Sequence, residues 1–202
     1  LTPPPAPALA EARALLTALG ALGAGGRITD HGRALAALPL HPRLGHMLLM
    51  SGAGAAPLAA LLADRDPLRG APCDLGLRLS ALRDPRRYAA DHPWPADRAT
   101  IERIRDEARR LARLAPAAKA GTSDAQAAAL AYPDRIGLRR KGEEPRYVLS
   151  GGKGAFVAEG DALARARLLV ATDLDGDPRE ARIRQGIAIA EPELREMFAS
   201  AI

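Results

Sequence analysis

Apolar residues recur at helical spacing along the first part of the chain. A helix is predicted over 8–19, where four leucines share one face and Gly20 follows as a C-cap: Leu9, Leu15, Leu16 and Leu19. A short strand is predicted over 27–29. A second helix is predicted over 30–38, with Thr29 or Asp30 able to cap its first turn. Helix, strand and helix in this order predict a minimal winged-helix module.

From Pro42 to Pro116 the pattern stays helical. Helices are predicted over 42–51, 57–65, 74–83 and 97–115, and the stretch that holds Pro85, Pro93 and Pro95 is predicted as a loop. The last helix has the strongest pattern, because one apolar stripe runs along it while Arg and Glu fill the other face. Asp106 and Arg110 lie four residues apart and can pair. These segments predict a helical bundle.

After Pro133 the apolar period changes from 3.6 to 2. A helix capped by Ser123 is predicted up to about Tyr132. Strands are then predicted over 135–140, 146–150, 155–158, 168–173 and 181–189, with a closing helix over 192–200. Five short strands separated by turn residues predict a small barrel, and a barrel of this size is commonly an OB-fold. The expected fold class is α+β, mainly α, with domains at 1–44, 45–118 and 119–202.

Composition and charge narrow the class of protein. Hydrophobic residues make up 48% of the chain but aromatic residues only 3%, so the core must consist of Leu, Ala, Val and Ile. The formal net charge of +5 favours a polyanionic partner. Cys73 is the single cysteine, which excludes an intrachain disulfide and fits a reducing compartment; we interpret it as a packing or capping residue. No run of 18 apolar residues exists, so no membrane span is expected.

Three motifs together carry a resemblance to a known family. The first is Arg-Ile-Thr-Asp-His-Gly-Arg-Ala-Leu-Ala-Ala-Leu-Pro-Leu-His-Pro-Arg-Leu-Gly-His-Met-Leu-Leu at 27–49. The others are Ala-Tyr-Pro-Asp-Arg-Ile at 131–136 and Arg-Tyr-Val-Leu-Ser-Gly-Gly-Lys-Gly-Ala at 146–155. In this combination the chain resembles the DEAH/RHA-type ATP-dependent helicases, and most of all the HrpB-type group. The resemblance runs from winged helix through a helical-bundle, or ratchet, domain to an OB-like domain.

The resemblance implies a non-catalytic C-terminal part of a cytoplasmic ATP-dependent RNA helicase that lacks the two RecA-like motor domains. Such a part forms one wall of the single-stranded nucleic-acid channel. It implies no cofactor in this stretch, with ATP and Mg²⁺ belonging to the whole helicase. The implied partners are single-stranded RNA or DNA bound without regard to sequence, the motor domains, and a protein regulator.

The sequence offers no catalytic or metal site of its own. No G-x-x-x-x-G-K-[ST] motif occurs, so we expect no ATP hydrolysis by this stretch. We interpret 151–154 as a hairpin turn, 106–109 as a solvated helix face and 173–177 as a polar turn rather than a calcium loop. His41 and His46 are spaced wrongly for a metal pair on one helix face, and His31 and His92 have no obvious partners.

Basic residues around the first predicted hairpin are the candidate nucleic-acid contacts. The candidates are Arg135, Arg139, Arg140, Lys141, Arg146, Tyr147 and Lys153. If side chains alternate, Arg135, Arg139 and Lys141 share a face and Arg140 points the other way. Tyr147 or Phe156 would supply a stacking surface. The alternative is that Tyr147 lies in the core and the arginines are ordinary solvated charges.

Two other functions stay open. The chain could be a protein-interaction module that docks a regulator of the helicase, and the salt dependence of binding would separate this from nucleic-acid binding. A winged-helix transcription factor is the weaker alternative. Its recognition helix over 30–38 is mostly Ala and Leu, with Arg33 as the one obvious donor to DNA, so this helix is predicted to be buried.

Overall fold

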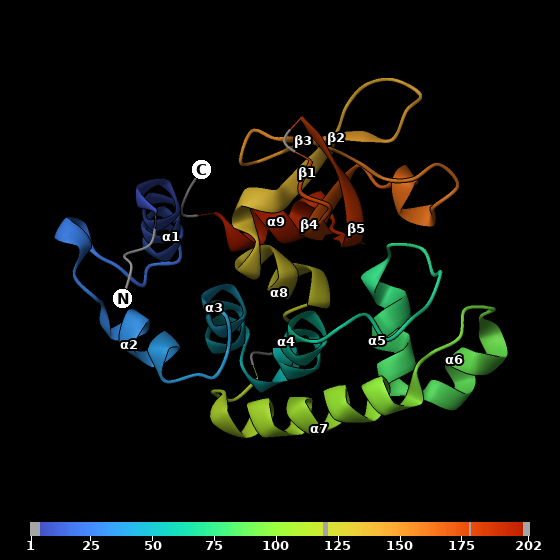
Figure 1. The fold of residues 1–202 in the computed structure, drawn as a ribbon, viewed down its shortest axis with the longest axis horizontal. Helices are drawn as coiled ribbons and strands as arrows, with labels where there is room; N and C mark the ends of the chain where they lie inside the picture. The colour runs from blue at the N-terminus through green and yellow to red at the C-terminus, as the bar shows by residue number, and fades with distance from the viewer. Residues whose placement is uncertain (1–4, 119–120, 178, 200–202) are drawn as a thin grey trace.

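A computed structural model describes residues 5–118, 121–177 and 179–199. Figure 1 shows helices at the left and along the bottom, and a barrel at the upper right. Helix α8 (Asp124–Ala131) lies between these two parts. The predicted Pro-rich start falls partly on residues 1–4, the predicted boundary at 118/119 reaches residues 119–120, and the predicted closing helix ends at 200. Residues 1–4, 119–120 and 200 lie outside the described ones.

The first part contains α1 (Ala6–Ala18) and α2 (Asp30–Ala36). Between them, the strand predicted over 27–29 is reduced to a single β-bridge between Leu22 and Ile28. A 3-10 turn at Ala24–Gly26 joins the two sides, and only one residue on each side forms the bridge. The Thr29 hydroxyl caps α2 by accepting a hydrogen bond from the Gly32 amide at 2.9 Å. Only glycine fits at position 32, because a Cβ would collide with the Ala21 carbonyl.

The bundle consists of α3 (Pro42–Ser51), α4 (Ala56–Ala63), α5 (Leu75–Arg83), α6 (Pro85–Asp91) and α7 (Arg98–Leu114). The loop predicted around Pro85 was wrong, since α6 starts there. Pro85 occupies the first turn, where its missing N–H costs nothing, and the Asp84 carboxylate accepts from the amides of Arg86 and Arg87. On α7 the i,i+4 pair does not form, because Asp106 pairs with Arg109 and Glu107 with Arg110.

One apolar core runs through the bundle and into the barrel. Its buried residues come from α3, α4, α5 and α7 and include Met47, Leu58 and Ile104. The predicted helix capped by Ser123 is α8, whose capping box joins Ser123 and Gln126. Nearly all of α8 is buried, and its alanines share a cluster with Val170 and Ile189 of the barrel region. Helix α8 therefore joins the two parts by packing rather than by chain connection alone.

The barrel strands are β1 (Ile136–Arg139), β2 (Arg146–Leu149), β3 (Gly154–Phe156), β4 (Leu168–Leu174) and β5 (Glu180–Ala188). They close in the order β1-β2-β3-β5-β4, with β3 and β5 parallel and the other pairs antiparallel. A 3-10 turn (Ala162–Arg165) lies between β3 and β4, and α9 (Glu191–Met197) follows β5. The predicted fold class is confirmed: mainly helical, with a winged-helix region and a closed five-stranded barrel.

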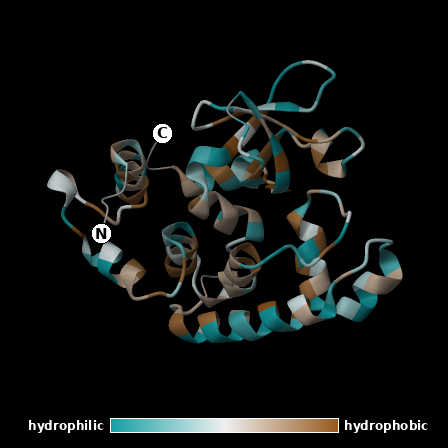
Figure 2. Ribbon diagram, viewed as in Figure 1, coloured by the Kyte–Doolittle hydropathy of each residue, from teal (hydrophilic) through white to brown (hydrophobic). Residues whose placement is uncertain are grey.

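The distribution of hydrophobic and polar residues matches this arrangement of elements. In Figure 2, α7 carries teal and brown residues in alternation along its length, as expected for a helix that packs one face and exposes the other. Among the described residues, no helix has both the length and the apolar composition needed to cross a membrane.

Candidate nucleic-acid interface

The structure separates the predicted basic residues into two groups at opposite ends of β1. Arg135 precedes β1, and the β2–β3 turn that holds Lys153 folds back beside it, because the Gly151 amide donates to the Asp134 carbonyl at 2.8 Å. The predicted hairpin turn at 151–154 is thus present between β2 and β3. The other group lies at the far end of β1, around the β1–β2 turn: Arg139, Arg140, Lys141 and Arg146.

At the β1–β2 end, the side chains alternate within the strand. Arg139 is half-buried and donates to the Glu143 carbonyl at 3.1 Å, whereas Arg140 is exposed on the other face. Lys141 lies in the turn after β1, and Arg135 lies in a 3-10 turn before it. Of the three residues predicted to share a face, only Arg139 lies in the strand, so strand alternation does not place the other two beside it.

Tyr147 lies inside the barrel and has no exposed ring face for a base, so its predicted contact with nucleic acid was wrong. The side chain is fully buried, and its hydroxyl donates to the carbonyl of Ala166 at 2.8 Å. Burial raises the pKa of this hydroxyl. The core interpretation of Tyr147 is the correct one, because residue 147 faces inward while Arg146 and Val148 face outward.

At the other end of β1, two arginines flank one tyrosine ring. The guanidinium carbons of Arg43 and Arg135 lie 5.2 Å and 5.1 Å from the centroid of Tyr132. Arg43 also makes two hydrogen bonds to the Asp134 carboxylate, at 2.5 Å and 2.9 Å. Burial alone would raise the pKa of Asp134, but the hydrogen bonds and charge of Arg43 outweigh it and hold this pKa low.

A groove of about 970 Å³ adjoins this cluster and extends to α1. Its walls are mostly aliphatic, from residues such as Leu15, Leu40 and Leu62; its charged side chains are Arg43 and Arg135, and the His41 imidazole lies beside them. Burial lowers the pKa of His41, and the charges of Arg43 and Arg135 lower it further. Arg135 is thus the one predicted contact that faces a large concave surface.

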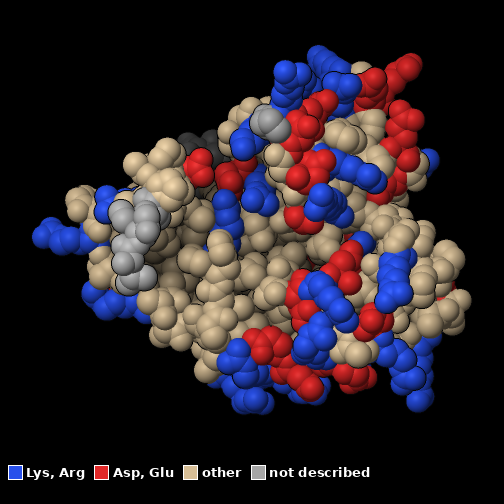
Figure 3. Space-filling model, viewed as in Figure 1, with Lys and Arg blue, Asp and Glu red and all other residues tan. Residues whose placement is uncertain are grey.

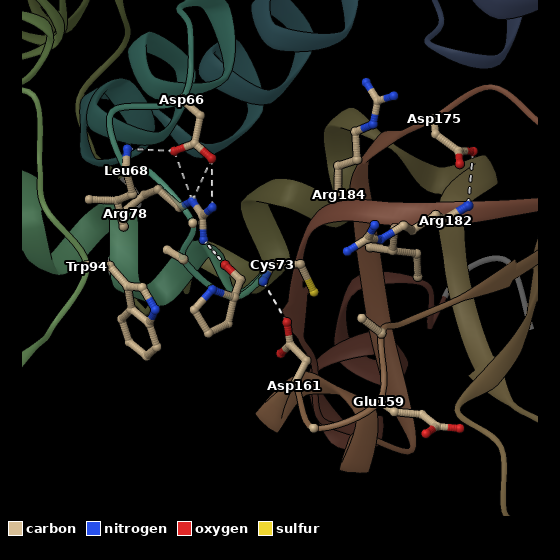
Figure 4. Close-up of a pocket in the computed structure, with 16 residues that line it drawn as sticks. Asp66, Leu68, Cys73, Arg78, Trp94, Glu159, Asp161, Asp175, Arg182 and Arg184 are labelled. Atoms are coloured by element: carbon tan, nitrogen blue, oxygen red, sulfur yellow. Dashed lines mark hydrogen bonds and ion pairs between the residues drawn. The ribbon is translucent and has the colours of Figure 1, made fainter.

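A second cleft, of about 500 Å³, lies between the bundle and the barrel, and sequence analysis did not find it. Figure 4 shows Trp94 on one side and Arg182 and Arg184 of β5 on the other. Arg182 and Arg184 lie two residues apart on one strand and therefore share a face, so the sequence pattern could have predicted that they line one surface. Trp94 lies in a loop, where no periodicity marks it.

Polar bonds fix the walls of this cleft. Arg78 is buried and pairs with Asp66 at 2.6 Å, and the Cys73 amide donates to the Asp161 carboxylate at 2.7 Å. The Cys73 side chain packs into the barrel core, where burial raises its thiol pKa, so the packing interpretation of Cys73 is confirmed.

Among the residues that the structure describes, no group of three His, Cys, Asp or Glu side chains is placed to hold an ion. Contrary to expectation, His31 has a partner, since its Nε2 lies 2.8 Å from Nδ1 of His46.

On the face seen in Figure 3, charges of both signs lie side by side. Figure 3 shows Lys and Arg alternating with Asp and Glu over the barrel and over the helices below it. The individual ion pairs agree with this view, since Arg146 pairs with Glu144 and Glu180 and Arg103 with Asp64.

Comparisons with known proteins agree with this architecture. Residues 12–40 match the model of the helicase associated domain (HA2), winged-helix. This match agrees with the winged-helix prediction for this stretch.

Longer matches are to HrpB of Escherichia coli. The ATP-dependent RNA helicase HrpB of strain K12 is 35% identical over 180 residues, which cover 85% of this chain and 19% of the relative. A crystal structure of the E. coli DExH-box NTPase HrpB superposes with a TM-score of 0.76 and 30% identity, over 98% of this chain and 23% of that one. A second, of the E. coli DEAH/RHA helicase HrpB, gives 0.70 and 29%, over 94% of this chain and 23% of that one.

The chain is homologous to the C-terminal region of HrpB, a DEAH/RHA helicase. It spans about a fifth of the length of these relatives, 19% in sequence and 23% in structure. The resemblance found from the three sequence motifs is therefore confirmed.

Proposed function

We propose that this chain is the non-catalytic C-terminal part of an ATP-dependent RNA helicase and forms one wall of its single-strand channel. The observation that carries the proposal is the match to HrpB structures over nearly the whole chain, at 98% coverage. We propose the same three parts as before, a winged helix at 1–44, a bundle at 45–118 and an OB-type barrel from 119. ATP, Mg²⁺ and the RecA-like motor domains belong to the whole helicase.

Charge and shape support a wall that contacts phosphates rather than bases. Arg135 is held by the Tyr132 ring and by the Thr172 carbonyl at 3.3 Å, beside a groove whose charged walls are all basic. Arg140, Lys141 and Lys153 are exposed at the two ends of the β1–β2–β3 sheet. Contacts of this kind are insensitive to sequence.

The test is fluorescence anisotropy of a labelled single-stranded RNA titrated with this chain at several salt concentrations. Binding should weaken as salt rises, with a slope set by the number of phosphates contacted. Reversing Arg135, Arg139 and Lys153 to Glu should abolish binding, whereas the same reversals at Arg98, Arg109 and Arg113 on α7 should reduce it far less. Absence of binding at low salt would contradict the proposal for this chain.

The second candidate is a docking module for a protein regulator. Leu138 and Val148 favour it, because these paired side chains are 49% and 42% exposed on the outside of the barrel. A docked protein would bind with little dependence on salt, so the same titration separates the two functions.

A further inference from the structure

The cleft between the bundle and the barrel differs in charge from the groove beside Tyr132. We call it the Trp94 cleft, and its volume is about 500 Å³. The charged side chains of the groove are the arginines Arg43 and Arg135. In the Trp94 cleft carboxylates outnumber guanidiniums, since its walls hold Asp66, Glu159, Asp161 and Asp175 against Arg78, Arg182 and Arg184. On a chain of net charge +5, this is a local reversal of sign.

The carboxylates of the cleft differ in what already binds them. Asp66 is paired with the buried Arg78 at 2.6 Å. The Asp161 carboxylate accepts from the Cys73 amide at 2.7 Å, which fixes its position and leaves its negative charge in place. Glu159 is exposed and, among the described residues, is in no ion pair. Glu159 is therefore the carboxylate available to a cation from outside.

Trp94 gives the cleft an aromatic wall. Its loop is fixed against the bundle, because the Asp97 amide donates to the Pro67 carbonyl at 2.8 Å. The His92 ring stacks on the indole, with centroids 6.0 Å apart and planes at 22°. Figure 4 shows the indole on the bundle side of the cleft. An aromatic face near carboxylates favours a guanidinium or an ammonium group, since both the ring and the carboxylates attract a cation.

A smaller hollow of about 270 Å³ adjoins the cleft, since Ala158 and Glu159 line both. The half-buried ring of Phe156 supplies an aromatic wall here too. Carboxylates are again in excess, with Glu144, Glu159 and Glu180 against Arg146. Two adjoining hollows, each with a ring and an excess of carboxylates, suit an extended segment with several cations better than they suit one small ion.

We propose that the Trp94 cleft is the docking site for an extended, arginine-rich segment of a partner protein. One arginine of the segment lies on the Trp94 ring and pairs with Glu159. Charge complementarity selects this occupant, because a nucleic-acid strand would bring phosphates against Glu159 and Asp161. The inference goes beyond the proposed function and does not depend on RNA binding.

The experiment measures binding of the 202-residue chain to a fluorescein-labelled peptide of four Arg-Gly repeats by anisotropy at low salt. Trp94 is the single tryptophan of the chain, so its emission reports on the cleft itself. This emission is followed with the acetylated peptide that carries no label. Binding should change the emission and should weaken as salt rises.

Three substitutions test the cleft. Glu159→Gln should raise Kd about threefold, and Trp94→Leu, which removes the ring but keeps an apolar side chain, about fivefold. Arg184→Gln should lower Kd about twofold, because it removes a charge that repels the peptide. The matched controls on α7 are Glu102→Gln and Arg113→Gln, both at exposed residues and with the same changes in net charge. Both controls should bind as the unchanged chain does.

The sign of the Arg184 effect identifies the occupant. Weaker peptide binding by Arg184→Gln would overturn the inference, and so would equal Kd values for Glu159→Gln and Glu102→Gln. Absence of peptide binding at low salt, or tighter binding of a Glu-Gly repeat peptide, would overturn it as well. Melting curves establish that each variant is folded.

Nucleic acid is tested separately with a 12-nucleotide oligouridine. It should leave the Trp94 emission unchanged. An emission change that Arg184→Gln reduces would assign the cleft to RNA and overturn the inference, while the proposed function would stand. If the chain binds the peptide but no RNA, the proposed function fails and this inference stands.

Discussion

Tyr147 follows Arg146 in a basic segment, and its ring points the opposite way. Strand alternation sends its ring into the barrel, where it is fully buried and its hydroxyl bonds the carbonyls of the 3-10 turn that precedes β4. In a barrel with few aromatic residues, this side chain fills much of the interior. Its role is therefore to hold the barrel together.

Tyr147 variants should separate packing from hydrogen bonding. Tyr147→Phe keeps the ring but leaves the Ala166 carbonyl without its donor, so the free energy of unfolding should fall by about 1 kcal/mol. Tyr147→Ala adds a cavity and should cost about 3–5 kcal/mol. Urea unfolding followed by circular dichroism measures both. Equal losses for the two variants would mean that the ring contributes nothing to packing.

At the scale of elements, α2 is joined to α3 by an imidazole pair. His31 and His46 lie edge to face, with ring centroids 5.0 Å apart. A hydrogen bond of 2.8 Å joins Nε2 of His31 to Nδ1 of His46. Burial, together with the charge of His31, lowers the pKa of His46 from 6.5 to about 4. The nearby charged groups on these helices are already paired, Arg33 with Asp30 and Arg43 with Asp134.

This pair predicts a loss of stability in acid. Between pH 6.5 and about 4, the unfolded chain protonates His46 and the folded chain does not. The contribution of this group to the free energy of unfolding should therefore be complete above pH 6.5. It should fall as pH decreases through this window, by up to about 1.4 kcal/mol per pH unit. His46→Gln should flatten the curve over the same window. His31→Gln leaves the burial of His46 in place and should keep most of the slope. Parallel curves for His46→Gln and the unchanged chain would contradict this.

Across the whole molecule, a few polar contacts fix how the helices sit against the barrel. Arg43 of α3 bonds Asp134 before β1, and the Asp134 carbonyl accepts from Gly151 in the turn that holds Lys153. A Cβ at Gly151 would lie 2.9 Å from that carbonyl, so the turn can approach only because the residue is glycine. On the other side, the Cys73 amide bonds Asp161 and the Cys73 carbonyl accepts from Gly186 at 3.0 Å. Both ends of the barrel are thus tied to the bundle.

The Arg43–Asp134 contact should show a measurable coupling. In a double-mutant cycle with Arg43→Gln and Asp134→Asn, the coupling energy should be about 1–2 kcal/mol, because the Arg43 side chain is only 12% exposed. The exposed Arg33–Asp30 pair on α2 is the control and should show almost none. Chemical denaturation of the four proteins in each cycle gives the values. A coupling no larger than that of the control pair would show that burial adds nothing to this contact.

The sequence by itself determined the helices and strands whose patterns are local. Amphipathic spacing gave α7, side-chain caps gave the starts of α2 and α8, and alternation gave all five barrel strands to within a few residues. It also pointed to the right relatives through three motifs. Local pattern failed at α6, where a proline that usually ends helices begins one, and at the strand over 27–29, which lacks a long enough partner.

Only the tertiary structure decided which residues meet. Packing of the bundle against the barrel brought Trp94 opposite Arg182, and packing of α2 against α3 paired His31 with His46. The tertiary structure also decided that Leu138 and Val148 stay in solvent while Tyr147 does not. The physical reason is that such contacts join residues far apart in the chain, whereas periodicity and capping depend only on neighbours within a turn or a strand.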